Sequence, residues 1–173
     1  NRTMELVLSP GQLTLLLNRT EGWISGLQLA IISMRATPDR STFFSDFSGE
    51  DKFISDYLTD DVLSGLSEHL RTFLLQTSIL ERLSAPLCEA VTGQPGAQGI
   101  LEQLVDANLF IVPLDSQQVW FRYHVLFADL LRKRLQEEVG RQAGDLHLRA
   151  GRWFEENGAI ELAIEHAMAG KDF

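Results

Sequence analysis

A single histidine, His124, stands where a predicted β-strand passes into a predicted amphipathic helix, within the stretch FRYHVLFADLLRKRL. The first turn of a helix presents unpaired N–H groups and a partial positive charge, which favour an anion such as phosphate. An imidazole at this place can donate to an anion, and Arg122 adds a fixed positive charge two residues earlier. A capping or surface histidine has the same pattern. The residues alone therefore leave two interpretations open, an anion contact and a structural histidine.

The other residues with chemical potential form weaker patterns. Cys88, the one cysteine, lies on a short apolar predicted helix, which favours a buried, inert thiol over a nucleophile. Glu161, Glu165 and His166 lie close together on a predicted helix, but they do not converge as metal ligands must, so a solvated helix face explains them better. The sequence has no Gly-x-x-x-x-Gly-Lys-Ser/Thr phosphate loop. We therefore expect no catalytic residue, no metal site and no enzymatic activity.

The charge of the chain restricts its partners. Its 173 residues carry a formal net charge of −9, whereas binding to nucleic acid depends on a basic face that neutralises phosphates. No apolar run approaches the ~18 residues that span a bilayer, and the first residues do not have the layout of a signal peptide. Together with the single cysteine, these features predict a cytoplasmic protein without membrane contact.

The elements that must position His124 are mostly helices. The residues SPGQ at 9–12 predict a helix start with a capping box, and the helix should end near Asn18. Thr20 is the predicted cap of a second helix, whose apolar residues recur at helical spacing. We assign residues 1–36 to the end of a larger helical domain. Residues 37–66, with aromatic residues among acids, are predicted to form a helical connector.

Residues 67–138 follow the element order of a winged-helix domain. Three predicted helices precede the segments FIVPL, DSQQ and VWFRY, which predict a β-hairpin. A third helix that reads DNA needs basic or amide side chains on its outer face. Here that face combines Gln98 and Gln103 with Glu102 and Asp106, and it has no basic residue. We therefore predict a winged helix that serves packing and protein contacts.

Residues 141–173 predict one pair of helices with alanines at the crossing. Such pairs are the unit of TPR-like solenoids, in which further repeats cover the apolar face of each pair. We expect a helix break after Gly140 and an uncovered apolar face that includes Trp153, Phe154 and Leu162, through which the chain could self-associate. The predicted fold is thus mainly α, with a helical segment, a winged helix with one small hairpin, and the first helix pair of a solenoid.

Five ordered segments resemble one known family. They are RTEGWISGLQLA, FLLQTSILERLSAPLCEAVTG, LEQLVDANLFIVPLD, RYHVLFADLLRKRL and WFEENGAIELAIEHAMAGKDF. The chain is similar to the large ATP-dependent regulators of the LuxR family, the MalT-like STAND transcription activators of bacteria. The resemblance implies a central piece of a longer regulator, between a nucleotide-binding domain and a solenoid that senses an inducer, with DNA bound by a separate C-terminal helix-turn-helix.

The resemblance also assigns roles to four residues. His124 matches the histidine of the Met-His-Asp motif, which contacts the β-phosphate of ADP, although Tyr123 and Val125 replace its neighbours. Arg122 is expected to assist it. Gly22 and Trp23 fall where a Gly-x-Pro element packs on adenine, and the proline is missing here. ADP or ATP is thus expected as a cofactor of the full-length regulator, but not of this piece alone.

Two other functions stay open at this stage. A protein–protein scaffold would need no nucleotide, and a phosphate loop upstream in the gene would argue against it. A DNA-binding repressor domain would bind DNA with strong salt dependence. The inducer and the target operator are not indicated by the residues.

Overall fold

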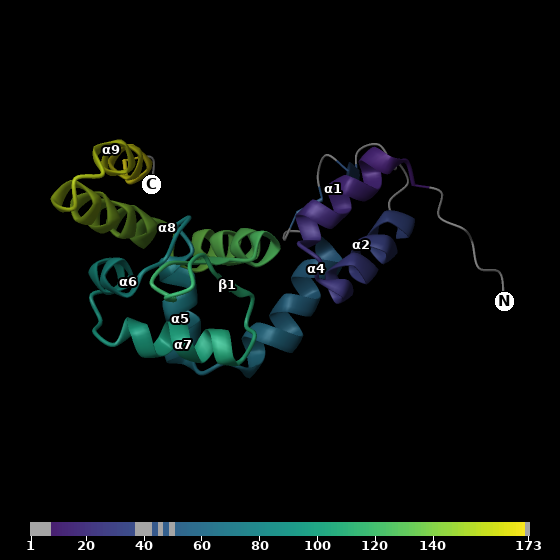
Figure 1. Ribbon diagram of the computed structural model, residues 1–173, viewed down its shortest axis with the longest axis horizontal. Coiled ribbons are helices and arrows are strands. Elements are labelled where there is room, and N and C mark those ends of the chain that lie inside the picture. The colour runs from purple at the N-terminus through teal and green to yellow at the C-terminus, as the bar shows by residue number, and fades with distance from the viewer. Residues whose placement is uncertain (1–7, 37–42, 45–46, 49–50, 172–173) are drawn as a thin grey trace.

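The computed structural model shows a mainly α-helical protein with one small antiparallel sheet, as predicted. The structure describes residues 8–36, 43–44, 47–48 and 51–171. Helices α1, α2 and α4 form one end of the molecule, the winged helix forms the middle, and α9 lies at the other end (Figure 1). Within the described part of the chain, no helix combines the length and apolar character needed to cross a membrane.

The first two helices are joined by a tight turn. Helix α1, Pro10–Thr20, begins with the predicted capping box, in which Ser9 and Gln12 bond reciprocally. The predicted role of Thr20 as the next cap is wrong, because its hydroxyl donates back to the Leu16 carbonyl inside α1. The chain then turns through Glu21 and Gly22, both with positive φ, and α2 follows at Ile24–Ala36.

The predicted connector lies partly outside the described residues. Its described part contains α4, Lys52–Tyr57, followed by a π-helical turn, Leu58–Val62, and a 3₁₀ turn, Leu63–Gly65. The Asp51 side chain caps α4 by accepting from the Phe53 amide. Helix α4 packs against α2, and the two short turns after it lead into the winged helix.

The winged helix has the predicted order of three helices and a hairpin. Helices α5, α6 and α7 span Glu68–Thr77, Ala85–Thr92 and Ala97–Asp106, and strands β1 and β2 span Ile111–Pro113 and Phe121–Tyr123. The strands are antiparallel, with Val112 opposite Arg122. On the other edge of β2, Leu83 forms an isolated antiparallel bridge with Phe121, with N···O distances of 2.7 and 2.8 Å. The outcome is a helix–bridge–helix–helix–hairpin fold.

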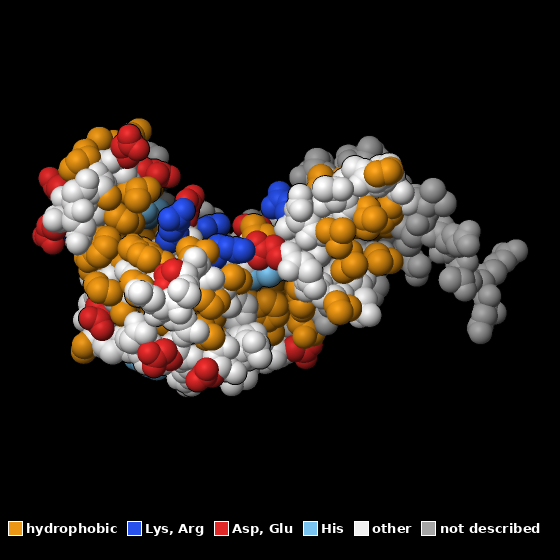
Figure 2. Space-filling model, viewed as in Figure 1, with side chains coloured by type: hydrophobic (Ala, Val, Ile, Leu, Met, Phe, Trp, Pro, Cys, Tyr) orange, Lys and Arg blue, Asp and Glu red, His pale blue; other side chains and the backbone are white. Residues whose placement is uncertain are grey.

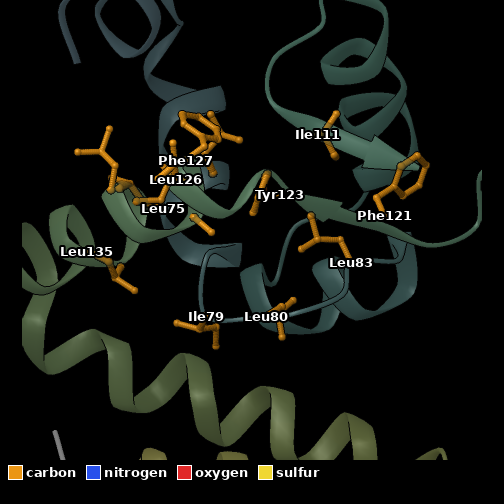
Figure 3. Packing of buried hydrophobic residues seen from close by; sticks show 14 of the residues in the cluster. Leu75, Ile79, Leu80, Leu83, Ile111, Phe121, Tyr123, Leu126, Phe127 and Leu135 are labelled. Carbon is orange, nitrogen blue, oxygen red and sulfur yellow. The ribbon is translucent and has the colours of Figure 1, made fainter. Parts of the chain in front are cut away.

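Alternation along β2 separates its two faces. Phe121 and Tyr123 are buried, whereas Arg122 between them is partly exposed. Figure 3 shows how side chains from α5, the 79–83 segment, both strands and the start of α8 gather in one cluster. The Tyr123 hydroxyl is satisfied within this core by Thr77 Oγ1 at 2.7 Å. Apolar packing therefore fixes the strand that leads directly to His124.

A single helix, α8, spans Val125–Glu156. The expected break after Gly140 is absent: a helical glycine costs only ~1 kcal/mol, and α8 packs against α5, α6 and α9. Whether a domain boundary lies within α8 stays a prediction. Helix α9, Ile160–Ala169, folds back on α8, where a Cβ at Gly151 would lie 3.2 Å from the Ala163 carbonyl oxygen.

Candidate functional site at the Thr20–His124 junction

His124 is the N-cap of α8 and is almost fully buried, with 6% of its surface exposed. Its Nδ1 accepts from the Leu126 amide at 3.3 Å, as the position at the helix start predicts. Its Nε2 lies 2.8 Å from the Thr20 carbonyl oxygen. Because Nδ1 accepts, Nε2 must carry the proton and donate to Thr20. The imidazole thus connects the winged helix to the end of α1.

Arg122 reinforces the same contact with an ion pair. Its guanidinium donates to both carboxylate oxygens of Glu21, at 2.9 and 3.1 Å, and to the Tyr123 carbonyl at 3.3 Å. Glu21 is held in a left-handed conformation, with φ of 49°, at the end of α1. Its second carboxylate oxygen lies 3.7 Å from Nε2 of His124. One carboxylate therefore faces both residues that the sequence nominated for an anion.

Aromatic rings close the junction on another side. Trp23 lies edge-on to Phe110, with centroids 4.9 Å apart, and 6.0 Å from the His124 ring. The Trp23 indole also lies against Gly26, where an added Cβ would fall 2.1 Å from it. Phe110 has a φ of 55°, which is uncommon for an aromatic residue, and its carbonyl accepts from the His124 amide at 2.7 Å. This cluster holds His124 in a fixed orientation.

A cavity of about 430 Å³ lies beside the junction, between α1 and the start of α8. Its lining includes Thr14, Asn18, Arg19, Glu21 and Val125. The N-terminus of α8 and the guanidinium of Arg19 suit an anion, whereas the Glu21 carboxylate opposes one. In this conformation Nε2 of His124 donates to the Thr20 carbonyl and Nη1 of Arg122 donates to the Glu21 carboxylate. A phosphate that used these two nitrogens would have to displace Thr20 and Glu21 from them.

The outer face of α7 carries only acidic and amide side chains at the four positions that the sequence placed there. Gln98, Glu102, Gln103 and Asp106 are all exposed, and the Gln98 amide donates to Glu102 at 2.8 Å. Two carboxylates on the face that would enter a major groove repel phosphate. The exposed face of α7 is therefore unsuited to binding the major groove of DNA.

Two further predictions about single residues can be compared with the structure. Cys88 is fully buried, as predicted, and burial raises its thiol pKa to about 12, which disfavours the nucleophilic thiolate. Glu161 and Glu165 are exposed as predicted, but His166 is buried against Phe154, because α9 turns this side chain toward α8. Among the described residues, no group of three or more metal-ligating side chains is close enough to hold a metal ion.

The fold and the junction define a class: a winged-helix domain that is fastened to preceding helices through the cap of its last helix. Residues 59–143 match the family of MalT winged helix domains, and this part of the chain belongs to that family. The matched range encloses the predicted range 67–138.

Similarity to two larger proteins extends beyond the winged helix. The serine/threonine-protein kinase PknK of Mycobacterium tuberculosis is 36% identical over 153 residues, which are 88% of this chain and 14% of the kinase. The HTH-type transcriptional regulator MalT of Yersinia pestis is 36% identical over 168 residues, 95% of this chain and 18% of that regulator. The chain thus spans less than a fifth of the curated relatives that it matches.

The structure adds partners that the sequence analysis missed. Thr20, Glu21 and Phe110 contact His124 or Arg122 from positions up to 104 residues away. The Glu21-Gly22 run after a helix is typical of a left-handed helix end, but it does not indicate which residues that end contacts.

Proposed function

We propose that this chain is the regulatory part of a bacterial, cytoplasmic transcription activator of the MalT type. In this proposal the winged helix links a nucleotide-binding domain to a solenoid that senses an inducer, and it neither reads DNA nor catalyses a reaction. The observation that carries the proposal is the combination of a MalT-family winged helix with an acidic outer face on α7. DNA would be bound by a helix-turn-helix elsewhere in the full-length regulator.

A direct test of the first part uses the 173-residue chain and fluorescently labelled duplex DNA. Anisotropy should show no binding at low salt, because α7 offers no basic residue to the phosphates. A control variant, Glu102→Arg with Asp106→Arg, measures how far charge alone limits binding. Salt-dependent binding by the unchanged chain would favour the DNA-binding repressor instead.

The second part of the proposal concerns ADP and ATP. His124 and Arg122 would donate to a nucleotide phosphate in the full-length regulator, where the nucleotide supplies the charge that stabilises the resting state. Gly22 and Trp23 would lie toward the adenine, although Trp23 is packed against Phe110 here. The phosphate would then compete with Thr20 and Glu21 for the same two donors.

This competition gives an experiment with a defined direction. In the full-length regulator, Glu21→Gln should increase ADP affinity, because the competing carboxylate charge is removed from Arg122. Glu68→Gln, which changes an exposed glutamate on α5, is the matched control. Reduced affinity for ADP in the Glu21 variant would contradict competition at this site.

A protein–protein scaffold is the second candidate, and the surface of α9 favours it. Ile160, Ile164 and Met168 lie one turn apart and are 54–64% exposed. Exposed apolar stripes of this kind commonly meet another protein surface, which in the proposal is a further solenoid repeat or a second copy. Sedimentation velocity of the chain, with Ile164→Lys as the comparison, measures its self-association.

A further inference from the structure

A second and larger cavity lies at the elbow between the winged helix and the α8–α9 pair. Its volume is about 840 Å³, which is in the range of sites for small molecules. We call it the elbow pocket and define it by six of its lining residues: Arg82, Trp120, Arg132, His147, Trp153 and His166. None of these residues takes part in the junction around His124.

Two tryptophans supply flat apolar surface to this pocket. Trp120 comes from the hairpin of the winged helix, and Trp153 comes from the last turn of α8. Both indoles are only partly buried, and Trp153 lies edge-on to Phe154 with centroids 5.4 Å apart. Partly exposed indoles in a cavity can pack on a planar ring. The pocket therefore favours a ligand with a flat apolar part.

The charged residues of the pocket differ from those of the whole chain. Arg82 and Arg132 line it together with Glu81 and Glu165, so the fixed charges balance locally although the chain carries −9. The Arg132 Nε donates to the Ser78 carbonyl at 3.0 Å, which anchors this side chain to the pocket wall. Figure 2 shows Lys and Arg side chains in the hollow beside α9, with acidic side chains both among them and on the outer surface.

The two histidines lie together at the base of the α8–α9 crossing. Nδ1 of His147 and Nδ1 of His166 are 2.9 Å apart, so that in the neutral pair one donates and the other accepts. The His166 ring stacks on Phe154. Burial lowers the pKa of both imidazoles, while Glu81 opposes this effect at His166. The pair therefore adds positive charge to the pocket when a bound anion favours its protonation.

We propose that the elbow pocket binds a small organic anion that carries a flat ring, such as an aryl carboxylate, sulfonate or phosphate. The ring would lie against the tryptophans, and the acid group would be bound by the arginines and the histidine pair. A neutral ring compound uses only the first of these features. The proposal does not depend on nucleotide binding at the junction around His124.

Naphthalene-1-sulfonate is a suitable probe because it combines one ring system with one fixed negative charge. It is titrated into the 173-residue chain, and the histidine ring resonances are followed by NMR. The resonances of His147 and His166 should shift with saturation, and their pKa values should rise when the probe is bound. His69 and His124, which lie outside the pocket, are internal controls and should not shift. Absence of saturable shifts at the histidine pair overturns the proposal.

Variants separate a specific site from general adhesion to apolar surface. Arg82→Gln should weaken probe binding about tenfold, the scale of one charge-assisted hydrogen bond. Because Arg82 is exposed, this change should leave the fold intact. Trp120→Ala should weaken binding by a similar factor. Arg71→Gln, which removes a partly exposed arginine outside the pocket, should have no effect. An equal effect of the Arg71 and Arg82 variants overturns the proposal.

The charge requirement is tested with naphthalene-1-methanol and methanesulfonate. The first keeps the ring without the charge, and the second keeps the charge without the ring. We expect both to bind at least about tenfold more weakly than naphthalene-1-sulfonate. Equal binding of the neutral alcohol would show that the pocket recognises the ring alone, which contradicts an anion site.

Discussion

Replacing His124 by alanine should destabilise the chain through two separate contacts. The imidazole caps α8 by accepting from the Leu126 amide, and loss of a cap costs about 1 kcal/mol. The same ring donates to the Thr20 carbonyl, which keeps its bond from the Trp23 amide at 2.7 Å, so losing the histidine bond costs about 0.5–1.5 kcal/mol. We therefore expect His124→Ala to lower the free energy of unfolding by roughly 1.5–2.5 kcal/mol.

Urea unfolding followed by circular dichroism measures this loss. His124→Asn is the matched comparison, because asparagine is a strong helix cap but is too short to reach Thr20. It should recover about 1 kcal/mol of the loss caused by alanine. His69→Ala, on the exposed face of α5, controls for removal of an imidazole. If His124→Ala costs less than about 0.5 kcal/mol, the two hydrogen bonds contribute far less than buried bonds should.

Three other results are expected. Gly26→Ala should strongly destabilise the chain, because its Cβ would lie 2.1 Å from the Trp23 indole. Gly99→Ala, whose Cβ would meet no atom within 4 Å, should instead stabilise α7 by up to about 1 kcal/mol in the same urea assay. A double-mutant cycle on Glu21 and Arg122 should give a coupling of at most about 1 kcal/mol, because the pair is partly exposed; a much larger value would indicate a desolvated contact. The elbow-pocket histidines have pKa values below the 6.5 of the unfolded chain, so the unfolded state binds more protons on acidification. Unfolding free energy should therefore fall between about pH 7 and pH 5, and less so when both are replaced by glutamine; equal falls would exclude this origin.

Local elements were predictable because their causes lie within a few residues. The capping box at Ser9 follows from short-range hydrogen bonding between Ser9 and Gln12. The hairpin followed from its aromatic and β-branched runs. His124 was correctly placed at the start of a helix for the same reason.

Features that depend on packing were not predictable in this way. Gly140 was expected to end a helix, but α8 continues through it because both of its halves are packed. Phe154 was expected on an uncovered face, yet it is 8% exposed because His166 stacks on it. For Gly140 and Phe154 the deciding contact is with a residue that local periodicity does not identify. Thr20 differs, because it was taken as a cap from its residue type alone and its hydroxyl bonds locally to the Leu16 carbonyl inside α1.

The same distinction applies to the candidate site. The strand-to-helix position and the resemblance nominated His124 and Arg122, and these two side chains do lie at one junction. Their present partners, Thr20 and Glu21, come from the far end of the sequence. Their proposed role with phosphate comes from the resemblance to the MalT-like regulators.

The most direct test of the proposed function is the ADP affinity of the full-length regulator, measured by calorimetry with His124→Ala and with His69→Ala as control. Weaker ADP binding in the His124 variant, together with transcription activation in the absence of inducer, is the predicted result. Unchanged affinity and unchanged basal activity would contradict a role in nucleotide sensing and would leave His124 as a structural cap in a protein–protein scaffold.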